Sequence, residues 1–337
     1  MSDVFAFAIG TARRSAQGNP LDLFFPAPIK TPDAELRDAI TGNFSAGAHD
    51  VDPRLAATLA ESMGDAGRAQ LLKALAEADA PLTAVLLEAD SAIETTAEAY
   101  LKLHLLSHRL ALPNTLNLDG IFAHLPNVAW TDRGPMDPTE LVTAQLKARL
   151  DGAHVEVLAV DKFPRMTNYV VPSGVRIADA SRIRLGAYLG DGTTVMHEGQ
   201  VNFNAGALGP NMVEGRISQG VVLGEHSDLG GSSSTMGTLS GGGEITITIG
   251  KHCLVGANAG TGIPLGDRCT IEAGLYITAG TPVSLMDEQG ELVSKLKARE
   301  LAGGSDLLFI RNGMTGRIEC RSNRKAIELN EQLHAHN

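Results

Sequence analysis

The chain has 337 residues, a formal net charge of −11 and only 4% aromatic residues. This acidic balance argues against a general nucleic-acid binder, and no apolar run reaches the roughly 18 residues of a membrane span. The beginning of the sequence shows no signal-peptide pattern. Its three cysteines, Cys253, Cys269 and Cys320, lack paired spacing. They therefore argue against a disulfide framework or a zinc site and predict a cytoplasmic protein.

Residues 1–165 show mixed α/β signals. "VFAFAIG" and "PLTAVLLEAD" predict buried strands, "RAQLLKALAEAD" predicts a helix, and "HVEVLAV" alternates like a strand. Ser91 and Glu94 form a capping-box pattern ahead of a helical segment. In "DPTELVTAQLKARL", Asp137 is expected at the N-cap, Pro138 at the first helical position, and Glu140 in position to close a box. We expect an α/β N-terminal domain over 1–165, for which the sequence indicates no function.

From residue 171 to 290 the helical signals disappear and apolar residues recur every sixth position. The first series contains Ile177, Ile183, Leu189, Val195, Val201, Ala207 and Val213. After a shift of four, the second contains Ile217, Leu223, Leu229, Thr235, Gly241, Ile247, Cys253, Ala259, Leu265, Ile271, Ile277 and Val283. Neither a helix nor an isolated strand has this period, whereas a hexapeptide-repeat β-helix does.

In such a β-helix each hexad is a short strand and a turn, three hexads close one triangular coil, and one residue per hexad points inward. We therefore predict a left-handed parallel β-helix over 166–290, followed by a C-terminal capping segment over 291–337. The stretch 285–301 reads as a loop that enters a helix at the open end of the prism, where it would cover a free strand edge. The broken hexads in "GGSSSTMGTLSGGGE" are expected to bulge outward as a loop.

Left-handed hexapeptide prisms resemble, as a class, trimeric acyl-CoA-dependent acyltransferases with sites between neighbouring prisms. Such enzymes often use a histidine base, for which His197 and His226 are candidates, while His252 fits the wall better. Glu214 and Arg216, in "PNMVEGRIS", are expected on one strand face, where a carboxylate and a guanidinium suit an anionic, amine-bearing substrate. A surface salt pair is the alternative.

The segments "MHEGQVNFNAGALGPNMVEGRIS", "MGTLSGGG", "CLVGANAGTGIPLGDRCTIEAGLYITAGT" and "KARELAG…LLFIRN" resemble the tetrahydrodipicolinate N-succinyltransferase family. The similarity is to the longer variant of actinobacteria and pseudomonads, and it covers most of residues 165–337. It implies transfer of succinyl from succinyl-CoA, a co-substrate, to tetrahydrodipicolinate in diaminopimelate and lysine biosynthesis. It also implies a homotrimer, with small molecules as the other partners and no tightly bound cofactor.

The resemblance assigns catalysis to Glu214, as a base or an acyl-anhydride nucleophile, and to Gly237, whose N–H would face the thioester oxygen. It also assigns contacts with succinyl-CoA to Arg216, Gly231, Ser234, Ala257, Glu272, Ala273, Gly280, Lys297, Ile310, Arg311, Asn312 and Gly313. Of these, Lys297 and Arg311 would lie near the CoA phosphates.

The family's magnesium ion on the trimer axis would be held by Glu198 from each chain. The family's second ligand, an aspartate, is replaced here by Ser181, and three carboxylates bind a hard cation less strongly than six. The nearby Asp179 would point to the opposite face of a regular strand.

Two other functions stay open. An acyltransferase that uses acetyl-CoA with an amino-sugar or serine acceptor would depend on a histidine base such as His197. A non-enzymatic trimeric scaffold or a metal-binding β-helix would need several histidines that converge at a subunit boundary, and the three prism histidines are widely spaced in the sequence.

Overall fold

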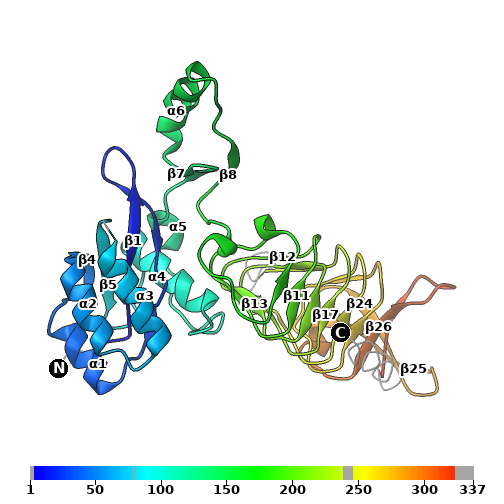
Figure 1. Cartoon of the computed structure of the whole chain (residues 1–337). Helices are drawn as coiled ribbons and strands as arrows, with labels where there is room; N and C mark the ends of the chain where they lie inside the picture. Colours follow the sequence, from blue (N-terminus) through cyan, green and yellow to red (C-terminus); the bar gives the residue numbers. More distant parts are fainter. Residues whose placement is uncertain (1–3, 79, 238–245, 323–337) are drawn as a thin grey trace. The chain divides into compact units, whose positions relative to one another are not determined.

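The computed structural model describes residues 4–78, 80–237 and 246–322 (Figure 1). The chain forms two compact units. The first comprises residues 1–111, 115–164 and 168–170, and the second comprises 112–114, 165–167 and 171–337. Among the described residues, no helix combines the length and the apolar character that crossing a membrane requires.

The first unit is built on a sheet in which the strands lie in the order β2–β1–β5–β4, and β3 also pairs with β1. Its strands are β1 (Ala6–Arg14), β2 (Pro20–Phe24), β3 (Ile29–Lys30), β4 (Gly47–Val51) and β5 (Leu82–Leu87). The helices α1 (Ala34–Thr41), α2 (Pro53–Glu61) and α3 (Ala66–Glu77) contribute Leu36, Leu59 and Leu72 to the core formed with this sheet. The strand and helix predictions for this region are confirmed.

Helix α4 (Thr96–Ser107) is buried along nearly its whole length and packs against β2 and β5. Its N-cap is Thr95, whose hydroxyl accepts a hydrogen bond from the Glu98 N–H, so the prediction of a cap at Ser91 is wrong. The reason lies in tertiary contacts. The Ile93 N–H bonds to the Asp119 carbonyl, and the Ser91 carbonyl bonds to the buried Lys102, so this segment is held as a loop.

A smaller three-stranded sheet, β7–β6–β8, completes the first unit with the short helix α5 (Ile121–His124). Its strands are β6 (Val128–Thr131), β7 (Gly134–Met136) and β8 (Val157–Asp161). Helix α6 (Pro138–Leu150) begins as predicted, with Asp137 at the N-cap and Pro138 in the first turn. Glu140 does not close the capping box, because its carboxylate accepts a hydrogen bond from the Ala16 N–H instead.

The second unit is a three-sided parallel β-helix, with its coils stacked as successive loops in Figure 1. One side is a four-stranded sheet of β10 (Ala187–Leu189), β13 (Ala205–Ala207), β16 (Val222–Leu223) and β19 (Thr248–Ile249). A second is a five-stranded sheet of β12 (Gln200–Val201), β15 (Arg216–Ile217), β18 (Ser234–Thr235), β21 (Gly260–Thr261) and β23 (Tyr276–Ile277). This architecture confirms the hexapeptide prediction.

The third side is a ten-stranded sheet, whose first six strands lie in the coils. These are β9 (Arg176–Ile177), β11 (Thr193–Val195), β14 (Asn211–Val213), β17 (Asp228–Leu229), β20 (Leu254–Val255) and β22 (Thr270–Ile271). The other four close the C-terminal end: β24 (Pro282–Met286), β25 (Leu292–Lys297), β26 (Leu307–Arg311) and β27 (Ile318–Ser322).

The inward positions follow the pairing of the strands. Ala187 pairs with Ala205 and Thr193 with Asn211, so a standard coil has eighteen residues, which is three hexads. Gln200 pairs with Arg216 sixteen residues later, which accounts for the register shift noted in the sequence. The inward columns are filled by buried aliphatic residues such as Leu189, each of which contributes about 1.5–3 kcal/mol on burial.

The predicted inward register is wrong by two between residues 247 and 259. Leu223 stacks on Ile249 rather than Ile247, and Leu229 stacks on Val255 rather than Cys253. Thr235 likewise stacks on Thr261, so Ala259 lies beside that column. The coil from Val222 to Thr248 has twenty-six residues, which is eight more than the standard coil, or one hexad and two residues. A sixteen-residue coil from Leu254 to Thr270 then restores the period.

The structure tests part of the loop predicted in the glycine-rich stretch. Gly230 to Thr235 belong to the wall, because Asp228–Leu229 and Ser234–Thr235 are strands of the prism. The prediction of a bulge is therefore wrong for residues 230–235. Residues 238–245, on which the rest of this prediction falls, lie outside the described residues.

The C-terminal end of the prism differs from the prediction. Residues 285–301 form the antiparallel hairpin β24–β25 and one 3-10 turn, η3 (Ala298–Leu301), instead of a loop and a helix. The open edge of the last coil is covered by β26, which pairs in parallel with β22. Strand β27 then joins β26 to β24. Backbone pairing with a strand satisfies this edge more completely than a helix would.

Candidate functional site

The prism has three long edges, where the chain turns from one sheet to the next. Edge 1 joins the ten-stranded to the five-stranded sheet and contains Glu214 and Ser232. Edge 2 joins the five-stranded to the four-stranded sheet and contains Asn204 and Gly220. Edge 3 joins the four-stranded to the ten-stranded sheet and contains His226. Backbone hydrogen bonds between successive coils define each edge, such as Ser232 N–H to the Glu214 carbonyl at 3.2 Å.

Glu214 lies on edge 1, directly after β14, and its side chain is half-buried. Its backbone N–H donates to the Leu229 carbonyl at 2.8 Å, which fixes the residue in the wall. Gly231 on the next coil leaves the space beside the carboxylate open, since a Cβ placed there would lie 3.5 Å from the Glu214 Oε2. Among the described residues the carboxylate has no ion pair or hydrogen bond. It is therefore available to a ligand.

Arg216 does not share a strand face with Glu214, contrary to the prediction. The chain turns at Gly215, so Glu214 ends the ten-stranded side and Arg216 begins the five-stranded side. No ion pair joins them within the part of the chain that the structure describes, and the Arg216 side chain is exposed. Ser234 lies beside Arg216 on the neighbouring strand. The two groups therefore flank an edge and can approach a ligand from two sides.

Most of the other predicted CoA contacts continue along edge 1, one coil at a time. The Asn258 N–H bonds to the Gly231 carbonyl, and the Gly274 N–H bonds to the Ala257 carbonyl. The next residues in this column are Glu272 and Ala273, followed by the end of β26 and the segment Ile310, Arg311, Asn312 and Gly313. At about 4.8 Å per coil, the four steps from Glu214 to Arg311 span roughly 19 Å. The column forms a continuous track for an extended ligand.

Three predicted residues lie at the other end of the five-stranded side instead: Gly237 on edge 2, and Gly280 and Lys297 where β23 leads into β24. Gly237 packs against the Gln219 carbonyl and Ser218, at the far end of the five-stranded side from Glu214. At about 3.3 Å per residue, the five residues from Glu214 to Gln219 span roughly 16 Å. Gly280 follows β23, and Lys297 ends β25 opposite Pro282. A single prism therefore does not bring Glu214 and Gly237 together.

The residues predicted for the metal lie at the start of edge 1. The Glu198 side chain is 55% exposed and accepts a hydrogen bond from the Ser232 hydroxyl at 3.2 Å. Ser181 belongs to the 3-10 turn η2 (Ala180–Arg182), and its hydroxyl donates to the Asp179 carboxylate at 2.6 Å. The expectation for Asp179 assumed a regular strand and does not apply, because this segment is a turn with Asp179 at its N-cap. The hydrogen bonds that the hydroxyl and the backbone N–H of Ser181 donate to Asp179 lower the pKa of this carboxylate.

Carboxylate oxygens such as those of Glu198 are the ligand type that magnesium prefers, so the donor chemistry fits a hard cation. Within the described ranges of one chain, no three His, Cys, Asp or Glu side chains gather closely enough to hold a metal. Other copies of the chain would have to supply the remaining ligands.

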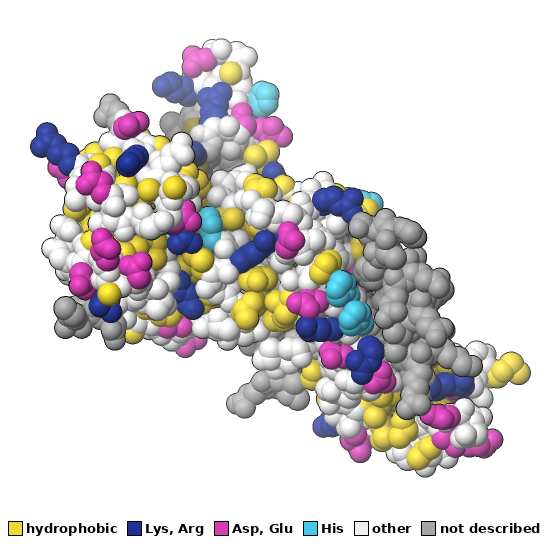
Figure 2. Space-filling model, turned by 60° about the horizontal axis from the view of Figure 1, so that its bottom comes forward, with side chains coloured by type: hydrophobic (Ala, Val, Ile, Leu, Met, Phe, Trp, Pro, Cys, Tyr) yellow, Lys and Arg dark blue, Asp and Glu magenta, His cyan; other side chains and the backbone are white. Residues whose placement is uncertain are grey.

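Two of the prism histidines lie together, although they were expected to be widely spaced. The rings of His226 and His252 stack with centroids 5.1 Å apart on edge 3, because they occupy the same corner of successive coils. On the face drawn in Figure 2, histidine side chains lie among acidic and basic side chains. His197 is separate. It is exposed, 4.0 Å from the Glu198 carboxylate, and lies on edge 1 next to the coil of Glu214.

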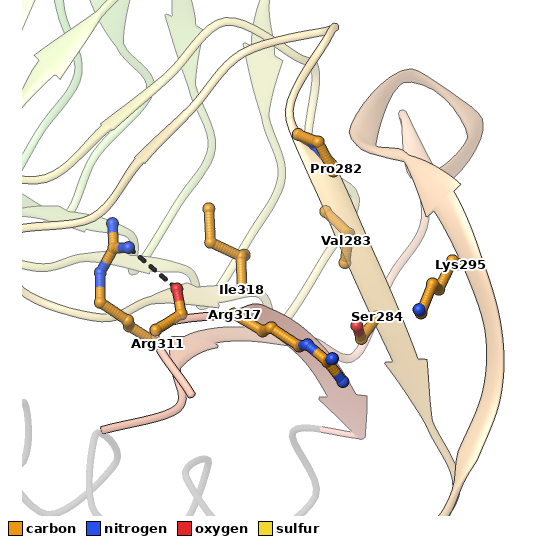
Figure 3. Close-up of a pocket in the computed structure, with 8 residues that line it drawn as sticks. Pro282, Val283, Ser284, Lys295, Arg311, Arg317 and Ile318 are labelled. Atoms are coloured by element: carbon orange, nitrogen blue, oxygen red, sulfur yellow. Dashed lines mark hydrogen bonds between the residues drawn. The ribbon is translucent and has the colours of Figure 1, made fainter. Parts of the chain in front are cut away.

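The structure also reveals a basic pocket that the sequence did not indicate. It has a volume of about 370 Å³ and lies at the C-terminal end of the prism, where the two hairpins meet (Figure 3). Lys295, Arg311 and Arg317 line it, and the first and last of these were missed. The only signal in the sequence was the presence of cations in the C-terminal strands, which a solvated surface would also show.

The comparisons with known proteins agree along the whole chain. A family model described as "Tetrahydrodipicolinate N-succinyltransferase middle" matches residues 125–165, and one described as "Hexapeptide repeat of succinyl-transferase" matches 246–279. A 2,3,4,5-tetrahydropyridine-2,6-dicarboxylate N-succinyltransferase of Pseudomonas putida is 57% identical over 99% of both chains. The Vibrio cholerae protein of the same name is 52% identical over 99% of both chains.

A solved structure supports the same relationship. It comes from Campylobacter jejuni and carries the name of a 2,3,4,5-tetrahydropyridine-2-carboxylate N-succinyltransferase. It aligns with a TM-score of 0.87 and 31% identity, over 97% of this chain and 94% of the other.

Proposed function

Because the chain belongs to the tetrahydropyridine-dicarboxylate N-succinyltransferase family, we propose that it moves the succinyl group of succinyl-CoA to the amino group of tetrahydrodipicolinate. It is an acyltransferase with succinyl-CoA as co-substrate, and its reaction belongs to diaminopimelate and lysine biosynthesis. The observation that supports the placement of the site is the unpaired Glu214 carboxylate at one end of the track on edge 1.

In the proposed reaction the cyclic imine first adds water. The N–H nitrogen of this hydrated amine then attacks the thioester carbonyl carbon, and a tetrahedral intermediate forms with negative charge on oxygen. Glu214 accepts the proton that the nitrogen releases, for which its half-buried, unpaired carboxylate is suited. The Gly237 N–H donates to the oxyanion, since a glycine lets the backbone approach closely. The carbon–sulfur bond then breaks, the amide carbonyl re-forms, and CoA leaves as a thiolate that takes up a proton. Arg216 pairs with a carboxylate of the acceptor or of the succinyl tail.

The active site we propose lies between subunits of a homotrimer of left-handed prisms. Two features support it. Glu214 and Gly237 are separated by the width of one prism side, and Arg216 is exposed on that side. If edge 1 of one copy faces edge 2 of the next, the seam holds Glu214 from one chain and Gly237, Gly280 and Lys297 from its neighbour. A closed ring of three copies repeats this seam three times.

Magnesium on the trimer axis remains part of the proposal, with Glu198 as the ligand from each chain. The ion would hold three carboxylates that otherwise repel one another. Removal of magnesium by a chelator should shift the trimer toward monomers for the unaltered chain and leave Glu198→Gln unaffected. A trimer mass that does not depend on magnesium in the unaltered chain would exclude this role.

The compartment we propose is the cytoplasm. Cys253, Cys269 and Cys320 are buried free thiols, which supports a reducing environment.

The experiment that tests the function measures thiol release from succinyl-CoA in the presence of tetrahydrodipicolinate. Glu214→Gln, which keeps the shape and removes the proton acceptor, should lower kcat by about 10²–10⁴, whereas His197→Gln should retain most activity. Loss of activity in His197→Gln with activity retained in Glu214→Gln would favour the histidine-dependent acetyltransferase alternative. Release of thiol only with another amine acceptor would overturn the substrate assignment.

The same preparation separates the two roles of Glu214. A proton acceptor leaves no covalent trace, so the intact mass of the enzyme with succinyl-CoA alone should equal that of the free chain. An increase by one succinyl group, lost on addition of acceptor and absent in Glu214→Gln, would instead support the anhydride.

A further inference from the structure

The basic pocket at the C-terminal end of the prism is built from the four consecutive strands β24 to β27 and the turn before β27. Val283 and Ser284 on β24 and Ile318 on β27 form its buried or half-buried lining. Lys295 comes from β25, where it pairs with Ser284, and Arg317 directly precedes β27. In Figure 3 the ammonium of Lys295 and the guanidinium of Arg317 both point toward Ser284. Two cations therefore face one hydroxyl-bearing strand.

The cations of this pocket have few partners among the described residues. Neither Lys295 nor Arg317 makes a side-chain hydrogen bond or an ion pair there, and the guanidinium of Arg311 donates only to the Gly316 carbonyl, at 3.2 Å. The buried carboxylate of Glu319 accepts hydrogen bonds from Asn312 and Arg321, which lower its pKa, and the charge of Arg317 adds to this effect without forming an ion pair. Unpaired cations grouped over an apolar floor, in a chain of net charge −11, form a site for an anion.

The position of the pocket indicates which anion it binds. Arg311 belongs both to the pocket and to edge 1, because its backbone N–H donates to the Glu272 carboxylate at 2.7 Å. The pocket thus lies at the far end of the track that begins at Glu214, roughly 19 Å away at about 4.8 Å per coil. Succinyl-CoA carries its thioester at one end and its phosphorylated nucleotide at the other. A ligand whose thioester lies at Glu214 would place its phosphates at this end.

We propose that this pocket binds the 3′-phosphate of the CoA nucleotide, and that Lys295 and Arg317 determine the preference for CoA over dephospho-CoA. The inference rests on the proposed function, because it uses CoA as the ligand of edge 1. The volume of about 370 Å³ suits part of a nucleotide rather than a lone ion. Arg317 offers a planar pair of donors and Lys295 a point charge, a combination that fits a phosphate monoester.

The test compares succinyl-CoA with succinyl-dephospho-CoA, which differ only in the 3′-phosphate. In the unaltered enzyme the KM for succinyl-CoA should be at least about tenfold lower. In Lys295→Ala/Arg317→Ala the two KM values should converge, while kcat changes less than about twofold, because the pocket is remote from the reacting atoms. Arg317→Lys should recover part of the preference. Lys251→Ala removes an exposed prism cation on edge 3 and is the matched control, for which no change is expected.

Binding measurements without acceptor separate this inference from the proposed function. Adenosine 3′,5′-bisphosphate should bind the unaltered chain in calorimetry, and the double variant should bind it about tenfold or more weakly. If the bisphosphate binds in this way and tetrahydrodipicolinate is not succinylated, only the acceptor assignment fails. Equal KM values in the unaltered enzyme, or an unchanged preference in the folded double variant, would overturn the inference.

Discussion

The backbone N–H of Arg311 donates a 2.7 Å hydrogen bond to the carboxylate of Glu272, thirty-nine residues earlier in the chain. This bond connects the strand that closes the prism to the last complete coil, at the edge where CoA is proposed to lie. The resemblance assigned both residues to CoA contacts. In the structure Glu272 has an additional structural role, because its carboxylate positions the segment that begins at Arg311.

We therefore predict that Glu272→Ala weakens CoA binding through the displacement of Arg311. The KM for succinyl-CoA should rise about three- to tenfold, since the lost bond joins a charged and a neutral group and is partly exposed. The value of kcat should change little. Glu272→Gln keeps an acceptor oxygen and should recover most of the affinity. If both variants raise KM equally, the carboxylate charge rather than the bond to Arg311 is what matters.

The division of the site between two edges predicts complementation between inactive chains. Glu214→Gln removes the proton acceptor on edge 1, and Gly237→Pro removes the backbone donor on edge 2. Each variant alone should be nearly inactive. When the two are unfolded together, refolded as a mixture and assayed, about a quarter of the seams should combine an intact Glu214 with an intact Gly237.

The control for this experiment is each variant refolded alone at the same total concentration. Activity of the mixture no higher than the sum of the two controls, in trimers shown to be mixed by mass, would mean that both residues act within one chain.

The first unit contains a histidine that predicts acid sensitivity. His104 on α4 is fully buried; its Nδ1 bonds to the Tyr100 carbonyl at 2.7 Å, and its Nε2 accepts from the Phe25 N–H at 3.3 Å. Burial lowers the pKa of His104 to about 3, against 6.5 in an unfolded chain. Between these two pH values, the unfolded state therefore binds a proton at His104 and the folded state does not.

The contribution of His104 to the free energy of unfolding should therefore be fully present above pH 6.5. It should decrease as the pH falls toward 3, by up to about 1.4 kcal/mol per pH unit. The emission of Trp130, the single tryptophan of the chain, can follow thermal unfolding of this unit between pH 7 and 5. The His104→Gln variant should be less stable than the unaltered chain at pH 7, but its stability should decrease less steeply as the pH is lowered. His252→Asn, at an exposed prism corner with φ of +56°, should keep the original slope. If stability changes equally steeply with pH in His104→Gln and in the unaltered chain, the prediction is wrong.

The polar residues in the inward columns predict a specific loss of stability. Thr261 is fully buried, and its hydroxyl donates to the Ile263 carbonyl at 2.8 Å and accepts from the Ile263 N–H at 3.2 Å. Thr261→Val keeps the shape but leaves both backbone groups without this partner, so it should cost about 1–3 kcal/mol. Thr248→Val, at an exposed position of β19, should stay within about 0.5 kcal/mol. Chemical denaturation of the two variants compares them, and equal losses would refute the role of the hydroxyl.

The agreement between sequence and structure is best where a feature depends on neighbouring residues alone. The six-residue period predicted the three-sided coil because each hexad places its own aliphatic residue inside, without reference to distant coils. The N-cap at Asp137 was predictable for the same reason. The cap at Thr95 was not, because contacts of Ile93 and Ser91 with distant groups decided where α4 begins.

The sequence by itself determined that the chain would form a hexapeptide prism after an α/β unit, and its motifs indicated the family and Glu214. Only the tertiary structure decided which residues share an edge. The lengths of the coils add up along the chain, so an insertion of eight residues shifts the register by two until a shorter coil restores it. A one-residue turn at Gly215 likewise separates Glu214 from Arg216. Lys295 and Arg317 line one pocket because two hairpins fold back on the last coil, and this pairing of strands has no local period that a sequence can display.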